Sequence, residues 1–271
     1  MAYENIIYEK NKPFSKIATI TLNRPQKLNA LSRPLLAEFE EALADAGKDD
    51  SIRVVIIKGA GRAFSGGYDM TPAPGERVAP RDVEEDRQEI YGGIERWLKI
   101  WDLPKPVIAQ VHGYCLAGAA QMVTFCDMTI IAEDARIGTP SIPVGGGLLG
   151  STMCWLIGPK LAKELSLNPG ATLSGKEMAA AGFGRAVPAD KLEEEVNTLA
   201  KSMTRTPLPI LRMKKQAINR VMDVQGFREA VHFGSEWDAI LHFSEPVKKM
   251  VGLVKEKGLR QAIKDYNDGK L

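Results

Sequence analysis

The feature that most constrains this chain is a succession of strand, small-residue run and helix between residues 107 and 125. Residues 107–111, VIAQV, are mostly apolar and β-branched, which is typical of a buried strand. Small residues dominate 112–120, and the apolar segment 121–125 predicts a helix. Backbone N–H groups at such a junction lack partners and can bind an anion or a developing oxyanion, and Gly118 has no Cβ to obstruct a ligand. Small residues at a strand–helix junction more commonly serve packing, so a second element must support the site.

A second loop of this kind lies upstream. Residues 54–57, VVII, predict another buried strand, and a turn of small residues at 65–69 follows it. Because ligands of open α/β sheets bind at the carboxyl ends of strands, loops near residues 68 and 118 can direct two backbone N–H groups at one carbonyl oxygen. The sequence therefore predicts an oxyanion hole built from main chain.

Five blocks resemble, in order and spacing, those of the crotonase (enoyl-CoA hydratase/isomerase) superfamily. They are TLNRPQKLNAL at 21–31, RAFSGGYD at 62–69, KPVIAQVHGYCLAGAA at 105–120, CDMTIIAEDARIGTPS at 126–141 and GSTMCWLIGPKLAKEL at 150–165. The resemblance implies an α/β fold, a crotonase-type spiral of ββα turns with a C-terminal helical trimerisation region. It places the spiral core and its acyl-CoA site at 1–200 and the helical region at 201–271.

The resemblance also assigns binding residues. It implies that the oxyanion hole consists of the backbone N–H groups of Tyr68 and Gly118. It implies that the segment after Arg24-Pro25 holds coenzyme A. The candidate contacts to coenzyme A are Lys27, Leu28, Ala30, Gly66 and Asp69. Lys27 is equally compatible with a solvated surface lysine, and a structural role is favoured for Asp69.

The chain departs from the hydratase pattern at the catalytic acids. Typical hydratases carry glutamates at the positions that Gln121 and Ser141 occupy here, and other family members carry an acid in the neighbourhood of residues 147–150, which read GLLG. An amide cannot titrate and a serine hydroxyl is a poor base, and losing a positioned acid or base typically costs about 10²–10⁴ in rate. Ordinary hydratase activity is therefore doubtful, and Gln121 and Ser141 are expected to hydrogen-bond a water or an acyl substituent.

Several residues are candidates for a substitute base, and the sequence favours none of them. They are the Tyr68 side chain, Asp69, an acid from the run at 82–89, His232 and His242. His112 directly follows the strand at 107–111, where a structural hydrogen bond at the turn is expected.

Composition limits the classes of binding partner that the sequence supports. Thirty-six basic and 34 acidic residues give a net charge of +2, which offers no strong electrostatic case for nucleic acid or an anionic membrane. No apolar run approaches the roughly 20 residues of a membrane helix. Cys115, Cys126 and Cys154 are odd in number and lie among apolar or small residues, which predicts buried free thiols in the cytoplasm and no metal site. Solvated helix faces are the default explanation for the basic residues near the C-terminus, which could also meet coenzyme A phosphates: Lys248, Lys249, Lys255, Lys257 and Arg260.

Hydrophobic patterns and breakers predict further elements. Strands are expected at 6–8 and 17–22, and two amphipathic patterns at 226–265. Helices are expected from the Ser32 cap to about residue 47, from residue 81 onward, and at 160–165, 190–203 and 210–222. The family resemblance implies that the helix from residue 81 borders the acyl pocket.

These observations lead to one expected function and two alternatives. The first is an acyl-CoA-processing enzyme of fatty acid metabolism, in which coenzyme A enters only as part of the thioester substrate and no cofactor is tightly bound. A catalytically silent acyl-CoA-binding protein is the alternative on the same scaffold, and a C–C bond hydrolase acting on a diketone is the third. The family resemblance implies a homotrimer or a dimer of trimers.

Overall fold

The computed structural model describes residues 3–10, 15–70, 82–139, 142–145 and 147–270, with the side chains of 147–149 left aside. In this part of the chain the main sheet has the strand order β1-β2-β3-β4-β6-β9. Only β1 and β2 pair in antiparallel fashion, and the other neighbours are parallel. The strands are β1 Ile6–Lys10, β2 Ile17–Leu22, β3 Val54–Gly59, β4 Val107–Val111, β6 Met128–Ala132 and β9 Arg185–Val187.

A smaller sheet with the order β5-β7-β8 consists of β5 Tyr114–Leu116, β7 Arg136–Gly138 and β8 Thr172–Ser174. The chain passes from β4 to β5 through His112 and Gly113, so it turns sharply from one sheet into the other. Gly113 has φ +56°, and a Cβ there would lie 2.1 Å from the carbonyl oxygen of Arg62, so only glycine fits. These three-residue strands are too short for a periodicity argument, and the sequence patterns did not predict them.

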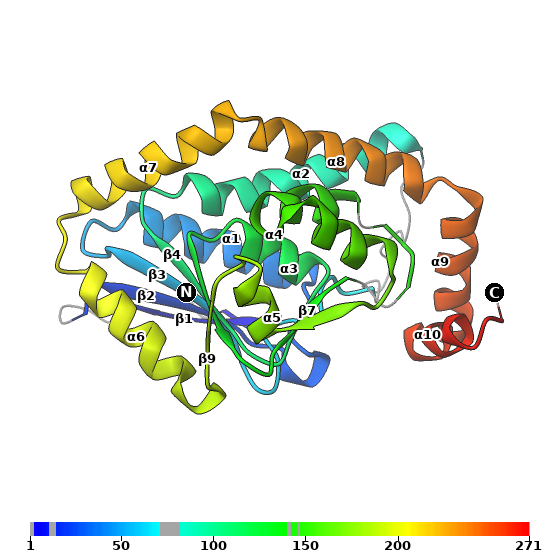
Figure 1. The fold of residues 1–271 in the computed structure, drawn as a ribbon, viewed down its shortest axis with the longest axis horizontal. Helices are drawn as coiled ribbons and strands as arrows, with labels where there is room; N and C mark the ends of the chain where they lie inside the picture. Colours follow the sequence, from blue (N-terminus) through cyan, green and yellow to red (C-terminus); the bar gives the residue numbers. More distant parts are fainter. Residues whose placement is uncertain (1–2, 11–14, 71–81, 140–141, 146, 271) are drawn as a thin grey trace.

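Helices cover the sheets and form the C-terminal part (Figure 1). Short 3₁₀ helices are η1 Pro25–Lys27 and η2 Ala189–Lys191. The α-helices are α1 Arg33–Lys48, α2 Val83–Asp102, α3 Gly118–Thr124, α4 Gly147–Leu167, α5 Gly175–Ala180, α6 Leu192–Met203, α7 Leu208–Val224, α8 Phe227–His242, α9 Glu245–Lys257 and α10 Leu259–Asn267.

The predicted cap of α1 is confirmed. The Ser32 hydroxyl accepts a hydrogen bond from the backbone N–H of Leu35 at 3.4 Å, as an N-cap serine does. Leu35, Leu36 and Phe39 on the first turns of α1 are buried against the sheet. Local capping and an apolar stripe together place this helix.

The helix expected at 160–165 is confirmed, and one expected pattern was wrong. Gly158, at φ +75° and ψ 158°, is a non-helical kink that divides α4 into two helical segments, and the second segment contains residues 160–165. The two amphipathic patterns at 226–265 are three helices, because Gly258 at φ +79° separates α9 from α10. In both cases a glycine bends the chain and the helical pattern resumes directly afterwards.

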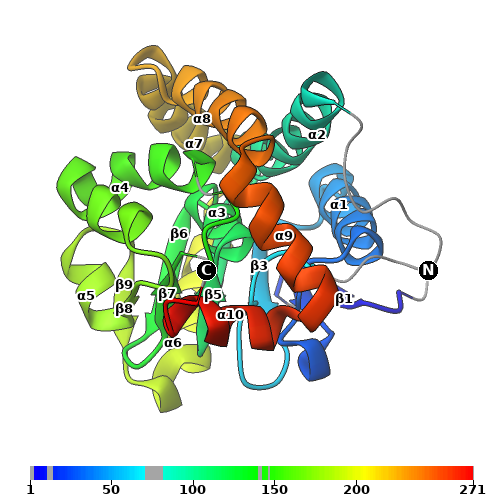
Figure 2. The same ribbon diagram turned by 90° about the vertical axis from the view of Figure 1, so that its right-hand side faces the viewer.

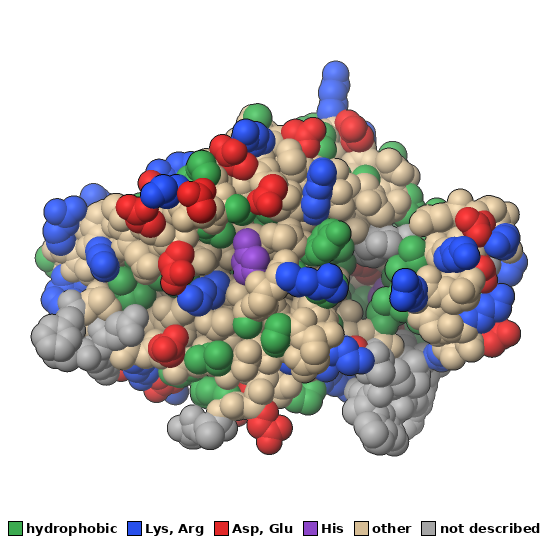
Figure 3. Space-filling view, turned by 90° about the horizontal axis from the view of Figure 1, so that it is seen from below, with side chains coloured by type: hydrophobic (Ala, Val, Ile, Leu, Met, Phe, Trp, Pro, Cys, Tyr) green, Lys and Arg blue, Asp and Glu red, His purple; other side chains and the backbone are tan. Residues whose placement is uncertain are grey.

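The C-terminal helices occupy the rim of the molecule. Figure 1 shows α7 and α8 running along one edge, with α9 and α10 at one end. In Figure 2, where that end faces the viewer, α9 and α10 lie in front of α3 and β5. Seen from below, the lobe formed by α9 and α10 stands off from the body, with Lys and Arg beside Asp and Glu on its surface (Figure 3).

No helix in the described ranges is long and apolar enough to cross a membrane.

Candidate functional site

Two loops that are remote in sequence are joined at the carboxyl ends of β3 and β4. The N–H of Ser65 donates to the Tyr114 carbonyl at 3.0 Å, and the N–H of Leu116 donates to the Ser65 carbonyl at 3.1 Å. The Ser65 hydroxyl donates to the Asn29 carbonyl at 2.8 Å and accepts from the N–H of Gly67 at 3.2 Å. This pairing, predicted from the positions of the two strands, brings the turn at 65–69 beside the start of α3.

The backbone at the contact is held in unusual conformations. Gly67 has φ +98°, and a Cβ there would lie 2.9 Å from the Leu116 carbonyl oxygen and 3.6 Å from the backbone nitrogen of Gly118. Ala117 has φ +50° and ψ −121°, a conformation that costs an L-residue free energy and that clusters at functional sites. The N–H groups of Tyr68 and Gly118 donate to no residue in the described part of the chain. Two available donors therefore lie on facing loops.

The Tyr68 side chain closes one side of this arrangement. Its ring lies over Gly118, where an added Cβ would come within 2.5 Å of a ring carbon. Its hydroxyl donates to Oε1 of Gln121 at 3.1 Å and accepts from Nε1 of Trp97 at 3.3 Å. Trp97 and Gln121 are buried, whereas 41% of the Tyr68 surface is exposed. We call Tyr68, Trp97 and Gln121 the Tyr68 cluster.

The Tyr68 cluster supplies donors and holds no base. Burial of the hydroxyl raises the pKa of Tyr68, and the nearby charge of Asp238 adds to this effect. The phenol therefore stays protonated at neutral pH, which argues against the Tyr68 side chain as the substitute base. Among the described residues, no carboxylate hydrogen-bonds to Tyr68, Trp97 or Gln121.

The candidate coenzyme A segment lies against the same turn. The N–H of Gly66 donates to the Leu28 carbonyl at 2.8 Å. Arg24 donates to the Ala30 carbonyl and pairs with Asp69, each at 2.8 Å. Asp69 thus ties the two segments together, in agreement with a structural role. The Lys27 side chain is exposed.

The remaining predicted residues divide into three cases. Ser141 lies outside the described residues. The His112 Nε2 is 2.9 Å from the Gly61 carbonyl oxygen, as expected for a structural hydrogen bond, and His232 stacks on Tyr91 with ring centroids 4.7 Å apart. His242 differs from both, because its Nδ1 lies 2.8 Å from Oδ2 of the buried Asp86 near the start of α2.

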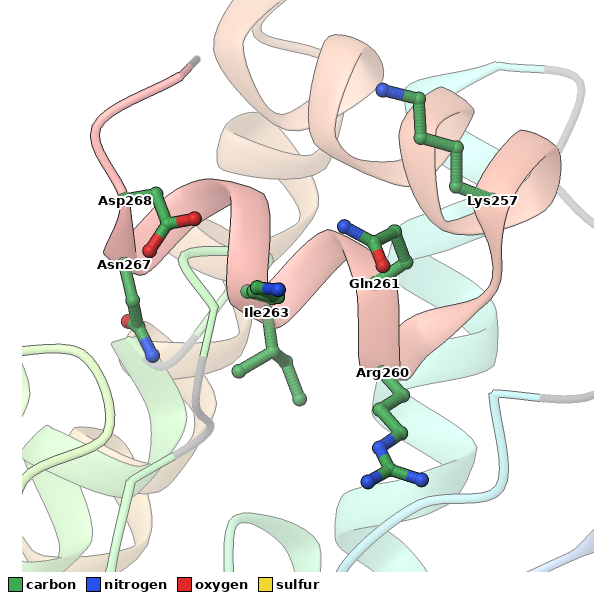
Figure 4. A pocket seen from close by; sticks show the side chains of 7 residues that line it. Lys257, Arg260, Gln261, Ile263, Asn267 and Asp268 are labelled. Carbon is green, nitrogen blue, oxygen red and sulfur yellow. The ribbon is translucent and has the colours of Figure 1, made fainter.

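Of the basic residues expected near the C-terminus, Lys257 and Arg260 line a separate pocket. A pocket of 650 Å³ is lined by α9, α10 and the turn that follows. Figure 4 shows Arg260 and Ile263 projecting from one side of α10, with Lys257 at the end of α9. Lys257 pairs with Asp265 at 3.1 Å, so part of its charge is compensated within the lobe.

The described ranges give little support for metal-dependent or cysteine-dependent chemistry. They contain no group of His, Cys, Asp and Glu side chains suited to hold a metal ion. The three cysteines are free, and Cys115 and Cys126 are buried. Burial raises the pKa of both buried thiols, which keeps them protonated and unreactive.

Two residues of the site were not assigned a role from sequence. Trp97 belongs to the predicted apolar face of α2, but only the fold shows that its indole N–H reaches Tyr68. Asp238 lies in the middle of α8 and is nonetheless buried, and no local pattern distinguishes it from a solvated acid.

Comparisons with known proteins identify the family of this chain. The family model described as enoyl-CoA hydratase/isomerase matches residues 13–247. A protein of Mycobacterium bovis named probable enoyl-CoA hydratase is 32% identical over 82% of this chain and 84% of its own. The crotonyl-CoA hydratase of Syntrophomonas wolfei is 30% identical over 82% of this chain and 84% of its own.

Solved structures extend the similarity to the whole chain. The crystal structure of an enoyl-CoA hydratase/isomerase from Xanthobacter autotrophicus superposes with a TM-score of 0.90 at 33% identity, over 100% of this chain and 99% of that one. The mixed α/β architecture is therefore the crotonase type. This chain belongs to the enoyl-CoA hydratase/isomerase family, the crotonase superfamily.

Proposed function

We propose that this protein is an acyl-CoA-processing enzyme that polarises a thioester carbonyl between the N–H groups of Tyr68 and Gly118. The observation that carries the proposal is the pair of available backbone donors on two facing loops, locked together by Ser65. Such preorganised donors stabilise the negative charge of an enolate-like oxygen, and removing one of them typically costs about 10²–10³ in kcat.

The residues around these donors suggest how the substrate is held. Leu28 and Ala30 lie beside the Gly66 turn, where the coenzyme A moiety would enter, and the exposed Lys27 can reach a phosphate. Gln121 accepts from Tyr68, and its amide N–H groups donate to no described residue, so they can donate to an acyl substituent or a water. An amide donor orients a group but cannot remove a proton, so hydration of simple enoyl-CoA substrates is expected to be weak.

A catalytically silent acyl-CoA-binding protein is the second candidate. The observation that favours it is the Tyr68 cluster, which pairs a tyrosine, a tryptophan and a glutamine without a carboxylate partner in the described ranges. The same donors would then hold the thioester without converting it.

Calorimetric titration with coenzyme A and crotonyl-CoA, with mass spectrometry of the same samples, separates the candidates. Binding with turnover supports the enzyme, and binding without turnover across a panel of acyl-CoA thioesters supports the binding protein. If neither compound binds, the acyl-CoA proposal is wrong and diketones become the substrates to test.

The proposed assembly is a homotrimer or a dimer of trimers, working in the cytoplasm. Large apolar side chains on α7 and α8 are more than half exposed in the single chain: Met213, Ile218, Val221, Val224, Phe233, Trp237 and Ile240. A surface of this kind is expected to be covered by another subunit. Sedimentation equilibrium at micromolar concentration tests this, and a monomer would contradict it.

A further inference from the structure

The Gln121 side chain lies next to the proposed oxyanion donors. Gln121 follows Gly118 by three residues on α3, so the two residues share one face of the helix. Side chains of an α-helix tilt toward its N-terminus, which directs the Gln121 amide toward the turn that holds the Gly118 N–H. Tyr68 joins the two, because its ring lies over Gly118 and its hydroxyl is 3.1 Å from Oε1 of Gln121. A carbonyl group bound at Gly118 therefore has the Gln121 amide as a close neighbour.

A chain of hydrogen bonds fixes the orientation of this amide. The indole Nε1–H of Trp97 can only donate, and it donates to the Tyr68 hydroxyl oxygen at 3.3 Å. The hydroxyl directs its own proton to Oε1 of Gln121. Burial raises the pKa of Tyr68, so this proton is retained at neutral pH. Trp97 thus sets the orientation of the amide through Tyr68, and Nε2 is the end that remains available.

Nε2 of Gln121 carries two N–H donors, and no acceptor for them exists among the described residues. Gln121 is only 7% exposed, so little water reaches it. A donor that is largely buried and has no partner is unfavourable. The arrangement is therefore complete only when a bound molecule supplies an acceptor oxygen.

Resting on the proposed function, we propose that Gln121 selects 3-oxoacyl thioesters, whose ketone oxygen at C3 accepts from Nε2–H while the thioester oxygen occupies the N–H groups of Tyr68 and Gly118. One carbon atom separates the two carbonyls of such a 1,3-dicarbonyl. Gly118 and Gln121 are separated by less than one helical turn, about 4.5 Å along the axis at 1.5 Å per residue. A ketone oxygen only accepts, so it pairs the amide donors without burying a new unpaired group.

Other groups at C3 fit this arrangement less well. A methylene, as in butyryl-CoA, leaves the Nε2 donors unpaired. A hydroxyl accepts from Nε2 but brings a proton that needs its own acceptor, and Oε1 of Gln121 already accepts from Tyr68. A carboxylate, as in malonyl-CoA, brings a charge that needs a cation. The cation that acts on the Tyr68 hydroxyl is Arg96, which is already paired with Glu40.

A substrate of this class also suits a site with an amide at an acid position. The hydrogen at C2 of a 3-oxoacyl thioester is more acidic than that of a simple thioester, because the enolate charge is shared by two carbonyl oxygens. Each of those oxygens has donors here, the backbone N–H groups at C1 and the Gln121 amide at C3. Gln121 therefore adds enolate stabilisation where a carboxylate would repel the same charge.

The test is titration calorimetry with four thioesters that differ at C3: acetoacetyl-CoA, 3-hydroxybutyryl-CoA, butyryl-CoA and malonyl-CoA. Mass spectrometry checks that each thioester stays intact. Acetoacetyl-CoA should bind about tenfold or more tightly than butyryl-CoA, since only the ketone pairs the buried donors. 3-Hydroxybutyryl-CoA should lie between these two, and malonyl-CoA should bind more weakly than acetoacetyl-CoA.

Variants assign the preference for acetoacetyl-CoA over butyryl-CoA to the hydrogen-bond chain. Gln121→Met removes the donors and should abolish the preference. Gln121→Glu keeps the size of the side chain and replaces the donors with an acceptor, so it should have the same effect and covers the case in which the methionine variant does not fold. Tyr68→Phe and Trp97→Phe should each reduce the preference several-fold, because the amide can then turn.

Trp101→Phe is the matched control on α2. It removes an indole N–H that is buried without a hydrogen-bond partner in the part of the chain that the structure describes. The preference for acetoacetyl-CoA should therefore be unchanged in this variant, in contrast to Trp97→Phe. Equal losses in the two tryptophan variants would contradict the role given to Trp97.

Equal affinity for acetoacetyl-CoA and butyryl-CoA overturns the inference, and so does tightest binding of malonyl-CoA. A preference that persists in Gln121→Met also overturns it, because the backbone donors alone would then select the dicarbonyl. In all three results thioesters still bind, so the proposed function stands. Failure of every thioester to bind overturns the proposed function itself.

Discussion

The residue that leaves least room for change in the proposed site is Gly118. Its open side is filled by the Tyr68 ring, whose hydroxyl is fixed by Gln121 and Trp97. The fit shows that the Tyr68 side chain and the Gly118 backbone form one unit. Changes at either residue should therefore be coupled.

Gly118→Ala should lower kcat/KM for the enzyme's best thioester by about 10²-fold or more, because the new methyl group displaces the Tyr68 ring and shifts one oxyanion donor. Steady-state kinetics on the single variant and on Gly118→Ala combined with Tyr68→Ala provide the measurement. The double variant should recover part of the loss, since the clash is removed. Unchanged activity in the single variant would exclude the proposed oxyanion hole.

Introducing glutamates at the two positions where typical hydratases carry acids tests the reaction type. Gln121→Glu together with Ser141→Glu should raise hydration of crotonyl-CoA by about 10² or more, because a water can then be activated and a proton delivered. The measurement is loss of the enoyl absorbance, with each single variant as control. If hydration does not rise, the shape of the acyl pocket, and not only the absence of the acids, excludes this substrate.

At the scale of elements, helix termini and kinks place the functional groups. α3 begins at Gly118 and carries Gln121 on its first turn, and α2 carries Trp97. Where an element carries a local signal, such as the Ser32 cap, its start is predictable. Where a glycine divides an amphipathic pattern, as Gly258 does between α9 and α10, the pattern alone misses the boundary.

Ser32→Ala should lower the free energy of unfolding by about 1 kcal/mol, the usual cost of removing an N-cap hydroxyl. Urea denaturation followed by circular dichroism measures it. Ser32→Thr keeps the acceptor and should remain close to the unsubstituted protein. An equal loss in both variants would assign the effect to side-chain packing.

For the whole molecule, a buried charge network attaches the C-terminal helices to the core. Lys215 on α7 donates to the carbonyls of Ile100 and Lys105, and it pairs with Asp127 at 2.8 Å. Asp127 in turn accepts from the N–H of Val107 at 2.7 Å. Lys215 thereby joins α7, the end of α2 and the start of β4 at one point.

Lys215→Met should destabilise the fold by about 3–5 kcal/mol, because it leaves Asp127 buried without its cation. Thermal and urea unfolding of the protein at fixed concentration measure the loss. The neighbouring Lys214 is exposed, and Lys214→Met should change stability little. Similar effects in both variants would mean that the ion pair does not hold the C-terminal region in place.

The sequence by itself determined the family, the strands β2, β3 and β4, the Ser32 cap and the two glycine-rich turns, because each depends on residues close together in the chain. It also revealed Gln121 and Ser141 in place of acids. Only the tertiary structure decided that Tyr68 covers Gly118 and that Asp86, a residue of the run at 82–89, meets His242 across more than half of the chain. Those contacts depend on how α2, α3 and α8 pack, and packing between remote segments leaves no periodic signal in any one of them.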